Sequence, residues 1–185
     1  AGGHDPYSVV TMWNNDTRGR IGTEFVLGGQ SVFNGNTTHD GVIVQAFPEG
    51  SYAAHLGKNG SQHMHDHSVG IEVCNFGPLT KVGNVFKTYV GTIVHPDQVC
   101  DLGFKFRGAQ YYHKYSEAQI EALRELILFI KERDGINIKK GLVEWLTTKT
   151  PNDAFEFNKD AEPILAPSFF CLPIFSPNFL DKSDL

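Results

Sequence analysis

Short blocks of apolar residues, separated by polar and glycine-rich stretches, set the pattern of this chain. Three blocks rich in β-branched residues predict buried strands over residues 23–27, 42–47 and 69–74. Residues 82–94 predict a hairpin with its turn near Gly91. Strands as short as these need helices packed against them to complete a core.

Residues that start and stop helices delimit two such segments. A short helix follows Asp5, whose carboxylate can cap it, with a proline at the first helical position. A longer helix covers residues 117–134: Ser116 and Gln119 form a capping box, apolar residues recur at helical spacing, and Gly135 ends it. We therefore expect an α/β (α+β) fold, with a central mixed β-sheet flanked by helices.

Length and composition narrow the class of protein. The 185 residues are expected to form a single domain over residues 1–185. Sixteen basic and 21 acidic residues leave a net charge of −5, which argues against nucleic-acid binding by bulk charge. No run is long and apolar enough to predict a membrane span. Residues 163–180 are atypical, because they carry no charge and include four prolines, which exclude a regular helix or a central strand.

Glu72 is the first candidate for chemistry, because it interrupts the apolar run of residues 69–74. Strand alternation places it on one face with Gly70 and Cys74. A carboxylate on a buried strand loses hydration, so its pKa is expected to rise into the range of a general base. The alternative is an edge strand on which Glu72 faces water.

Histidines supply the second set of candidates. In the HMHDH segment, His63, His65 and His67 alternate, so a strand would place three imidazoles on one face and could bind a metal ion. The polar residues before them favour a loop instead. On spacing alone, His55 is an ordinary loop residue, and residues 17–20 (TRGR) form a basic turn.

Several segments resemble the zinc-dependent N-acetylmuramoyl-L-alanine amidases of the Amidase_2 type, a family that includes phage lysozyme-amidases and peptidoglycan recognition proteins. Residues 68–75 (SVGIEVCN) resemble its SIGIE strand, the most specific element of the match. Residues 54–57 (AHLG) resemble its WHxG loop with Ala54 in place of tryptophan, and residues 182–184 (KSD) resemble its Lys-x-Asp motif. The likeness covers residues 1 to about 160 and resumes at Asp181.

This resemblance implies a peptidoglycan hydrolase that uses zinc-activated water to cleave the amide between N-acetylmuramic acid and the L-alanine of the stem peptide. It implies that Glu72 is the base, that Lys182 stabilises the oxyanion and that Asp184 is a zinc ligand. His55 and Asn75 are assigned to substrate binding. The implied place of action is the cell wall, the periplasm or the extracellular space, and a phage source is one of the options.

Two zinc-binding histidines of the family have no counterpart in this sequence. The first would precede Ala1, so we expect residues to be missing there; the second would fall within residues 173–176 (PIFS). Three explanations stay open. The chain is an active amidase whose sequence is incomplete before Ala1 and locally mistaken across 163–180, or an inactive module that binds peptidoglycan or serves a structural role, for example in a phage virion, or an enzyme whose ligands come from HMHDH. We favour the first, because charge and family-like residues return together at Asp181.

Overall fold

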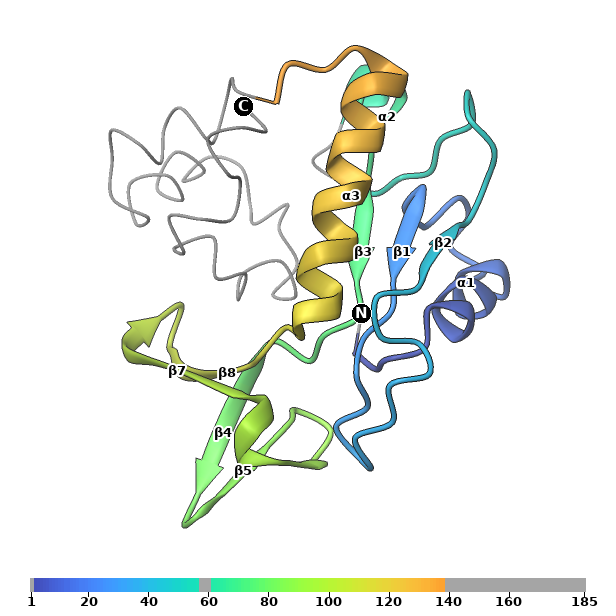
Figure 1. The fold of residues 1–185 in the computed structure, drawn as a ribbon. Helices are drawn as coiled ribbons and strands as arrows, with labels where there is room; N and C mark the ends of the chain where they lie inside the picture. The colour runs from blue at the N-terminus through green and yellow to red at the C-terminus, as the bar shows by residue number, and fades with distance from the viewer. Residues whose placement is uncertain (1, 57–60, 139–185) are drawn as a thin grey trace.

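The computed structural model of the protein describes residues 2–56 and 61–138 (Figure 1). A three-stranded sheet with the order β2-β1-β3 forms its centre. In this sheet β1 (Phe25–Leu27) is antiparallel to β2 (Ile43–Gln45) and parallel to β3 (Ile71–Val73). Each strand lies inside a predicted segment and is shorter than it, and the predicted mixed sheet is confirmed.

The two longer helices begin and end where the sequence predicts. In α1 (Pro6–Asn14), the side chain of Asp5 accepts a hydrogen bond from the N–H of the second helical residue at 2.9 Å. In α3 (Glu117–Asp134), both hydrogen bonds of the predicted capping box at Ser116 are present. Gly135 follows with a φ of 65°, a left-handed conformation that glycine adopts without strain.

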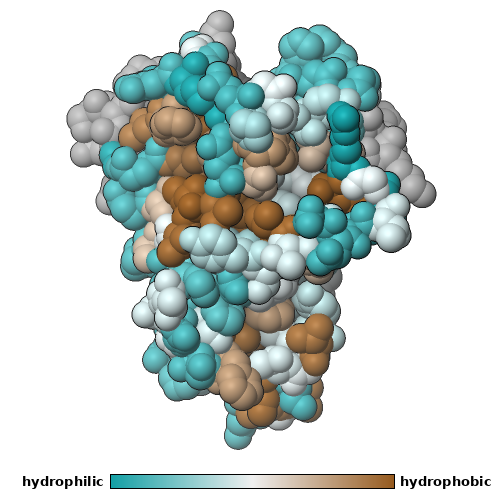
Figure 2. All heavy atoms as spheres, turned by 90° about the vertical axis from the view of Figure 1, so that its right-hand side faces the viewer, coloured by the Kyte–Doolittle hydropathy of each residue, from teal (hydrophilic) through white to brown (hydrophobic). Residues whose placement is uncertain are grey.

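These helices cover opposite faces of the sheet (Figure 1). Val26 of β1 packs on Val9 of α1, whereas its neighbour Leu27 packs with Leu123 of α3. This is the alternation of a strand buried on both faces. Figure 2 views the molecule from the side of α1 and β2, and shows a band of apolar side chains edged by hydrophilic ones.

A second sheet of five antiparallel strands projects away from the first (Figure 1). Its order is β6-β5-β4-β8-β7. Its elements in chain order are β4 (Pro78–Val82), β5 (Val85–Lys87), β6 (Ile93–Val94), the 3-10 helix η2 (Pro96–Gln98), β7 (Val99–Phe106) and β8 (Ala109–His113).

The predicted hairpin is confirmed as the pair β5–β6 with its turn at Gly91, but it accounts for only part of this sheet. Val82 ends a separate strand, β4, and a tighter turn at Gly83 joins β4 to β5. The sequence pattern did not predict β7 or β8. Their pairing is irregular, with a register shift between Asp101 and Phe106, and this breaks the period-two pattern that predicts strands.

The HMHDH segment forms a short helix, α2 (Gln62–Asp66), so the expectation of a shared strand face or a polar loop is wrong. The rings of His63 and His67, four residues apart, stack with centroids 4.1 Å apart. His65 is only 6% exposed. No helix in the described part of the chain is long and apolar enough to cross a bilayer.

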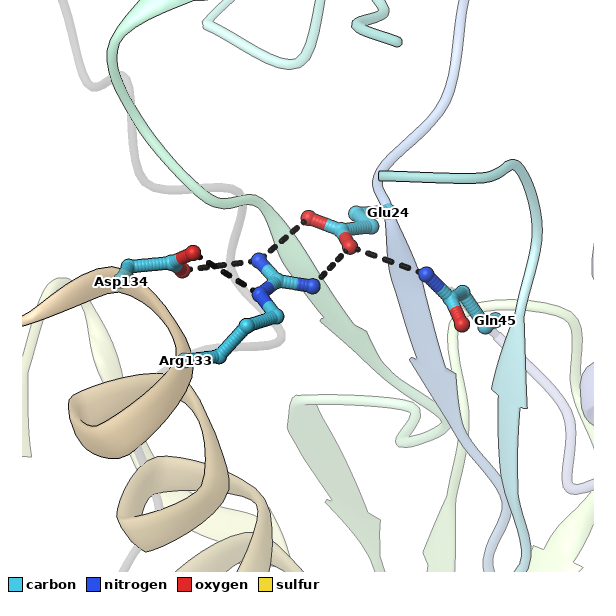
Figure 3. Close-up of polar contacts among 4 residues, drawn as sticks. All are labelled: Glu24, Gln45, Arg133 and Asp134. Carbon is cyan, nitrogen blue, oxygen red and sulfur yellow. Dashed lines mark hydrogen bonds and ion pairs between the residues drawn. The ribbon is translucent and has the colours of Figure 1, made fainter. Parts of the chain in front are cut away.

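A buried ion pair fixes the end of α3 against the sheet (Figure 3). The Arg133 guanidinium donates to both carboxylate oxygens of Glu24, and the contact to Oε2 measures 3.1 Å. It also donates to both oxygens of Asp134 at 2.8 Å, while Gln45 of β2 donates to Glu24 at 3.1 Å. Hydrogen bonds to Asp134 and Glu24 raise the pKa of Arg133. The network therefore joins α3, β2 and the residue before β1.

We expect Arg133→Met to lower the free energy of unfolding by about 3 kcal/mol, because it keeps the aliphatic stem but leaves the Glu24 carboxylate, 7% exposed, without its cation. Urea unfolding measures the loss. The double variant Glu24→Gln with Arg133→Met should recover part of it. Arg18→Met is the control, since Arg18 is 76% exposed. This variant should leave the free energy of unfolding unchanged. Equal stability of Arg133→Met and wild type would contradict this role.

Candidate active site

Glu72 lies in the middle of β3, opposite Val26 of β1 in the register. Ile71 and Val73 pack in the clusters on the α3 side, whereas Cys74 packs with Val26 in the cluster on the α1 side. The predicted alternation is thus present, and it places Glu72 on the α1 side of the sheet. Although β3 ends the described three-stranded sheet, Glu72 is half-buried rather than open to water.

His55 lies next to Glu72 on this face of β3. Gly70, two residues before Glu72, leaves room for it: a Cβ at this position would lie 2.8 Å from the Cγ of His55. The Nδ1 of His55 lies 3.0 Å from the carbonyl of Ala53, and its Nε2 lies 2.9 Å from the Oγ of Ser68. A carbonyl only accepts, so Nδ1 donates to it, and Nε2 accepts the hydroxyl proton in the neutral ring. Burial lowers the pKa of His55, which favours this neutral form.

His65, which lies on α2, packs against the ring of His55. Their rings meet edge to face, with centroids 5.4 Å apart. The Nδ1 of His65 is the one buried side-chain nitrogen or oxygen, among the residues described, without a hydrogen-bond partner. Sequence spacing alone did not predict the packing of His65 on His55 or the hydrogen bond from Ser68, because the three residues meet only through the fold.

The described residues do not by themselves make a metal centre. Within 2–56 and 61–138, no group of three or more His, Cys, Asp or Glu side chains is arranged to hold a metal ion. The helical form of α2 separates His65 from His63 and His67, which removes the shared face on which the HMHDH hypothesis depended. Lys182 and Asp184, the other predicted site residues, lie outside the described residues, as does the charge-free segment 163–180.

Asn75, predicted to bind substrate, is buried directly after β3 and joins that strand to the second sheet. Its amide donates to the carbonyl of His113 at 3.0 Å, and its oxygen accepts the N–H of Gly77 at 2.7 Å. The Nδ1 of His113 in turn accepts the N–H of Phe76 at 3.2 Å. Both ends of the Asn75 amide are thus used inside the protein, and its contact with substrate stays a prediction.

His113 makes stability depend on pH. Burial lowers its pKa to about 4, from an ordinary value near 6.5. Below pH 6.5 the unfolded chain takes up a proton that the folded chain rejects, so its contribution is fully present above pH 6.5 and is lost toward pH 4. We expect the free energy of unfolding to fall by about 2 kcal/mol between pH 6.5 and 5 from this group. Urea unfolding of His113→Gln should show a shallower pH dependence, and an unchanged slope would contradict the assignment.

Comparison with known protein families identifies the family to which this chain belongs. The family model Amidase_2, N-acetylmuramoyl-L-alanine amidase, matches residues 8–152. The match includes all but the first two residues of α1, both described sheets, and α3, together with Glu72. Because it spans well over half of the chain, this protein belongs to the N-acetylmuramoyl-L-alanine amidase family, and the predicted family is confirmed.

Among solved structures, the chain is similar to the N-acetylmuramyl-L-alanine amidase AmiD from E. coli, in complex with the substrate anhydro-N-acetylmuramic acid-L-Ala-D-gamma-Glu-L-Lys. The TM-score is 0.43 and the identity 22%, over 74% of this chain and 42% of that chain. This chain thus spans less than half the length of that relative. A search of curated proteins finds no match.

Proposed function

We propose that this protein hydrolyses the amide bond between the lactyl group of N-acetylmuramic acid and the L-alanine of the peptidoglycan stem peptide. The observation that carries the proposal is the position of Glu72. This carboxylate lies half-buried on the SVGIEVCN strand, inside the segment that the amidase family model matches. The substrate is a component of the cell wall, so the proposed place of action is the wall, the periplasm or the extracellular space, and a phage endolysin is one form that such an enzyme takes.

In the proposed reaction Glu72 takes a proton from the attacking water. A carboxylate can act as a general base when it lies within hydrogen-bond reach of the attacking water. The oxygen of water adds to the lactyl carbonyl, the carbon–nitrogen bond breaks, and the proton held by Glu72 passes to the leaving amine. His55 lines the substrate site on the same face of β3 and stays neutral, held by Ala53 and Ser68.

The proposal includes zinc because residues 182–184 resemble the Lys-x-Asp motif. In that motif, Asp184 would be a zinc ligand and Lys182 would be the cation that stabilises the oxyanion. When bound, a zinc ion lowers the pKa of water and polarises the carbonyl. The described residues do not complete a ligand set, so the proton transfer above is assigned to Glu72 alone.

The proposal is tested on purified cell walls. Incubation with the protein and zinc should release intact stem peptides with a free L-alanine amino group, detected by amino-group labelling and mass spectrometry. Binding to walls without any release, unchanged by a chelator, would contradict hydrolysis and would instead indicate an inactive peptidoglycan-binding module.

A further inference from the structure

Two exposed histidines lie side by side on α2. His63 and His67 are four residues apart, a spacing that brings side chains together on one face of a helix. Their ring centroids lie 4.1 Å apart, with 35° between the ring planes. The third histidine of the segment, His65, is buried and packs against the ring of His55 instead. The helix thus separates a buried imidazole from a solvent-exposed pair that has no part in the proposed reaction.

A hydrogen bond fixes the tautomer of one ring of this pair. The Nδ1 of His67 lies 2.8 Å from the carbonyl oxygen of His63. A carbonyl only accepts, so Nδ1 carries the proton of the neutral ring and the lone pair is on Nε2. Histidines that bind a metal ion through one ring nitrogen commonly donate the other N–H to a backbone carbonyl or a carboxylate. His67 already has this arrangement, and no described residue hydrogen-bonds to its Nε2.

The two rings are close enough to share an ion. An ion bound about 2.0 Å from each of two imidazole nitrogens requires these nitrogens to lie roughly 3 Å apart. Centroids 4.1 Å apart allow this separation after a small rotation of the exposed side chains. Imidazole suits Zn²⁺, Ni²⁺ and Cu²⁺, whereas Ca²⁺ and Mg²⁺ take oxygen ligands. In the part of the chain that the structure describes, no third His, Cys, Asp or Glu completes the group, so water would fill the other positions.

We propose that His63 and His67 form a two-ligand site for a divalent ion of the zinc, nickel and copper class, and that the ion stabilises α2. The pair can chelate only while the segment is helical, so the ion binds the helix and not the unfolded segment. Five residues are too few to form a stable helix on their own, which makes the effect of an ion measurable. The site is independent of the proposed hydrolysis. It stabilises the helix that carries His65 against His55.

Hydrogen exchange of the whole protein measures the effect at the helix itself, with Zn²⁺ as the probe. The N–H of His65 donates to the carbonyl of Ser61 at 3.0 Å, and the N–H of His67 donates to that of His63 at 3.1 Å. We expect Zn²⁺ to slow exchange of these two amides by up to about 100-fold at a free concentration of 100 times Kd. In ¹⁵N-histidine spectra, Zn²⁺ should shift Nε2 of His63 and His67 and leave Nδ1 of His67 protonated.

Substitutions identify the ligands. His63→Gln and His67→Gln should each weaken Zn²⁺ binding by about tenfold or more, because each leaves one imidazole. His95→Gln is the matched control, since it removes another exposed imidazole from the start of η2 and should keep the affinity. Asp184→Asn removes the ligand proposed for the catalytic zinc and should also keep the protection of α2.

Exchange of the α2 amides that is the same with and without Zn²⁺ would overturn the proposal. A loss of affinity in only one of the two histidine variants would also overturn it, because a single imidazole would then bind the ion. Zinc-dependent protection of α2 in a protein that does not hydrolyse walls would overturn the proposed function and leave this site standing. Hydrolysis without such protection would do the reverse.

Discussion

Glu72→Gln is expected to reduce the release of stem peptides from cell walls by about 10²- to 10⁴-fold, the range that a positioned general base contributes. Glutamine has nearly the same shape and keeps one acceptor oxygen, but its amide cannot take a proton from water. The loss should appear in kcat, with binding to walls retained. Initial rates on purified walls and pelleting with insoluble walls measure the two quantities.

The control for this variant is Glu132→Gln, which removes an exposed carboxylate from α3 and should leave the rate unchanged. Thermal unfolding of both variants must match wild type for the comparison to hold. If Glu72→Gln retains the wild-type rate, the carboxylate is not the base. The most specific element of the resemblance would then have no catalytic part.

Removal of zinc is expected to have the second large effect. Dialysis against a chelator should abolish hydrolysis, and added zinc should restore it, since a bound zinc ion would lower the pKa of the water from which Glu72 takes its proton. Asp184→Asn should lower zinc affinity and activity by more than the roughly 10- to 100-fold that loss of a residue supporting the ligands costs. Elemental analysis of zinc per chain, together with the rate on walls, gives both values.

The matched control is Asp181→Asn, which removes an acid three residues earlier that the resemblance does not assign to the metal. It should keep both zinc and activity. Full activity of the wild-type protein after exhaustive chelation, with no zinc bound, would contradict the metal assignment. The assignment of Glu72 as the base would still be decided by the Glu72→Gln variant.

Local signals explain which parts of the fold could be predicted from the sequence. The ends of α3 were predictable because the capping box at Ser116 and the glycine at position 135 act within a few residues. The strands around Glu72 were predictable because their segments are rich in β-branched residues, and β1 is buried on both faces. By contrast, β7 and β8 depend on pairing with each other, and their register shift hides the period.

Contacts between residues far apart in the sequence explain which features could not be predicted from it. Nothing local in Glu24 or Arg133 indicates that they pair, since 109 positions separate them. The five-residue HMHDH segment is too short to distinguish a period of 2 from one of 3.6, so its helix could not be predicted. Residues 17–20 predicted only a basic turn. That Arg20 forms no ion pair among the described residues became visible only once the fold placed Arg18 on Asp16 and Tyr52 beneath the guanidinium.

Hydrolysis of the amide bond between the lactyl group and L-alanine is tested most directly on a defined substrate. N-acetylmuramoyl-L-Ala-D-γ-Glu-L-Lys is incubated with the zinc-loaded protein in water enriched in heavy oxygen, and the products are analysed by mass spectrometry. Hydrolysis of the lactyl amide predicts the label in the carboxylate of N-acetylmuramic acid and an unlabelled tripeptide with a free alanine amino group. An intact substrate, or label in a fragment of the peptide, would contradict the account.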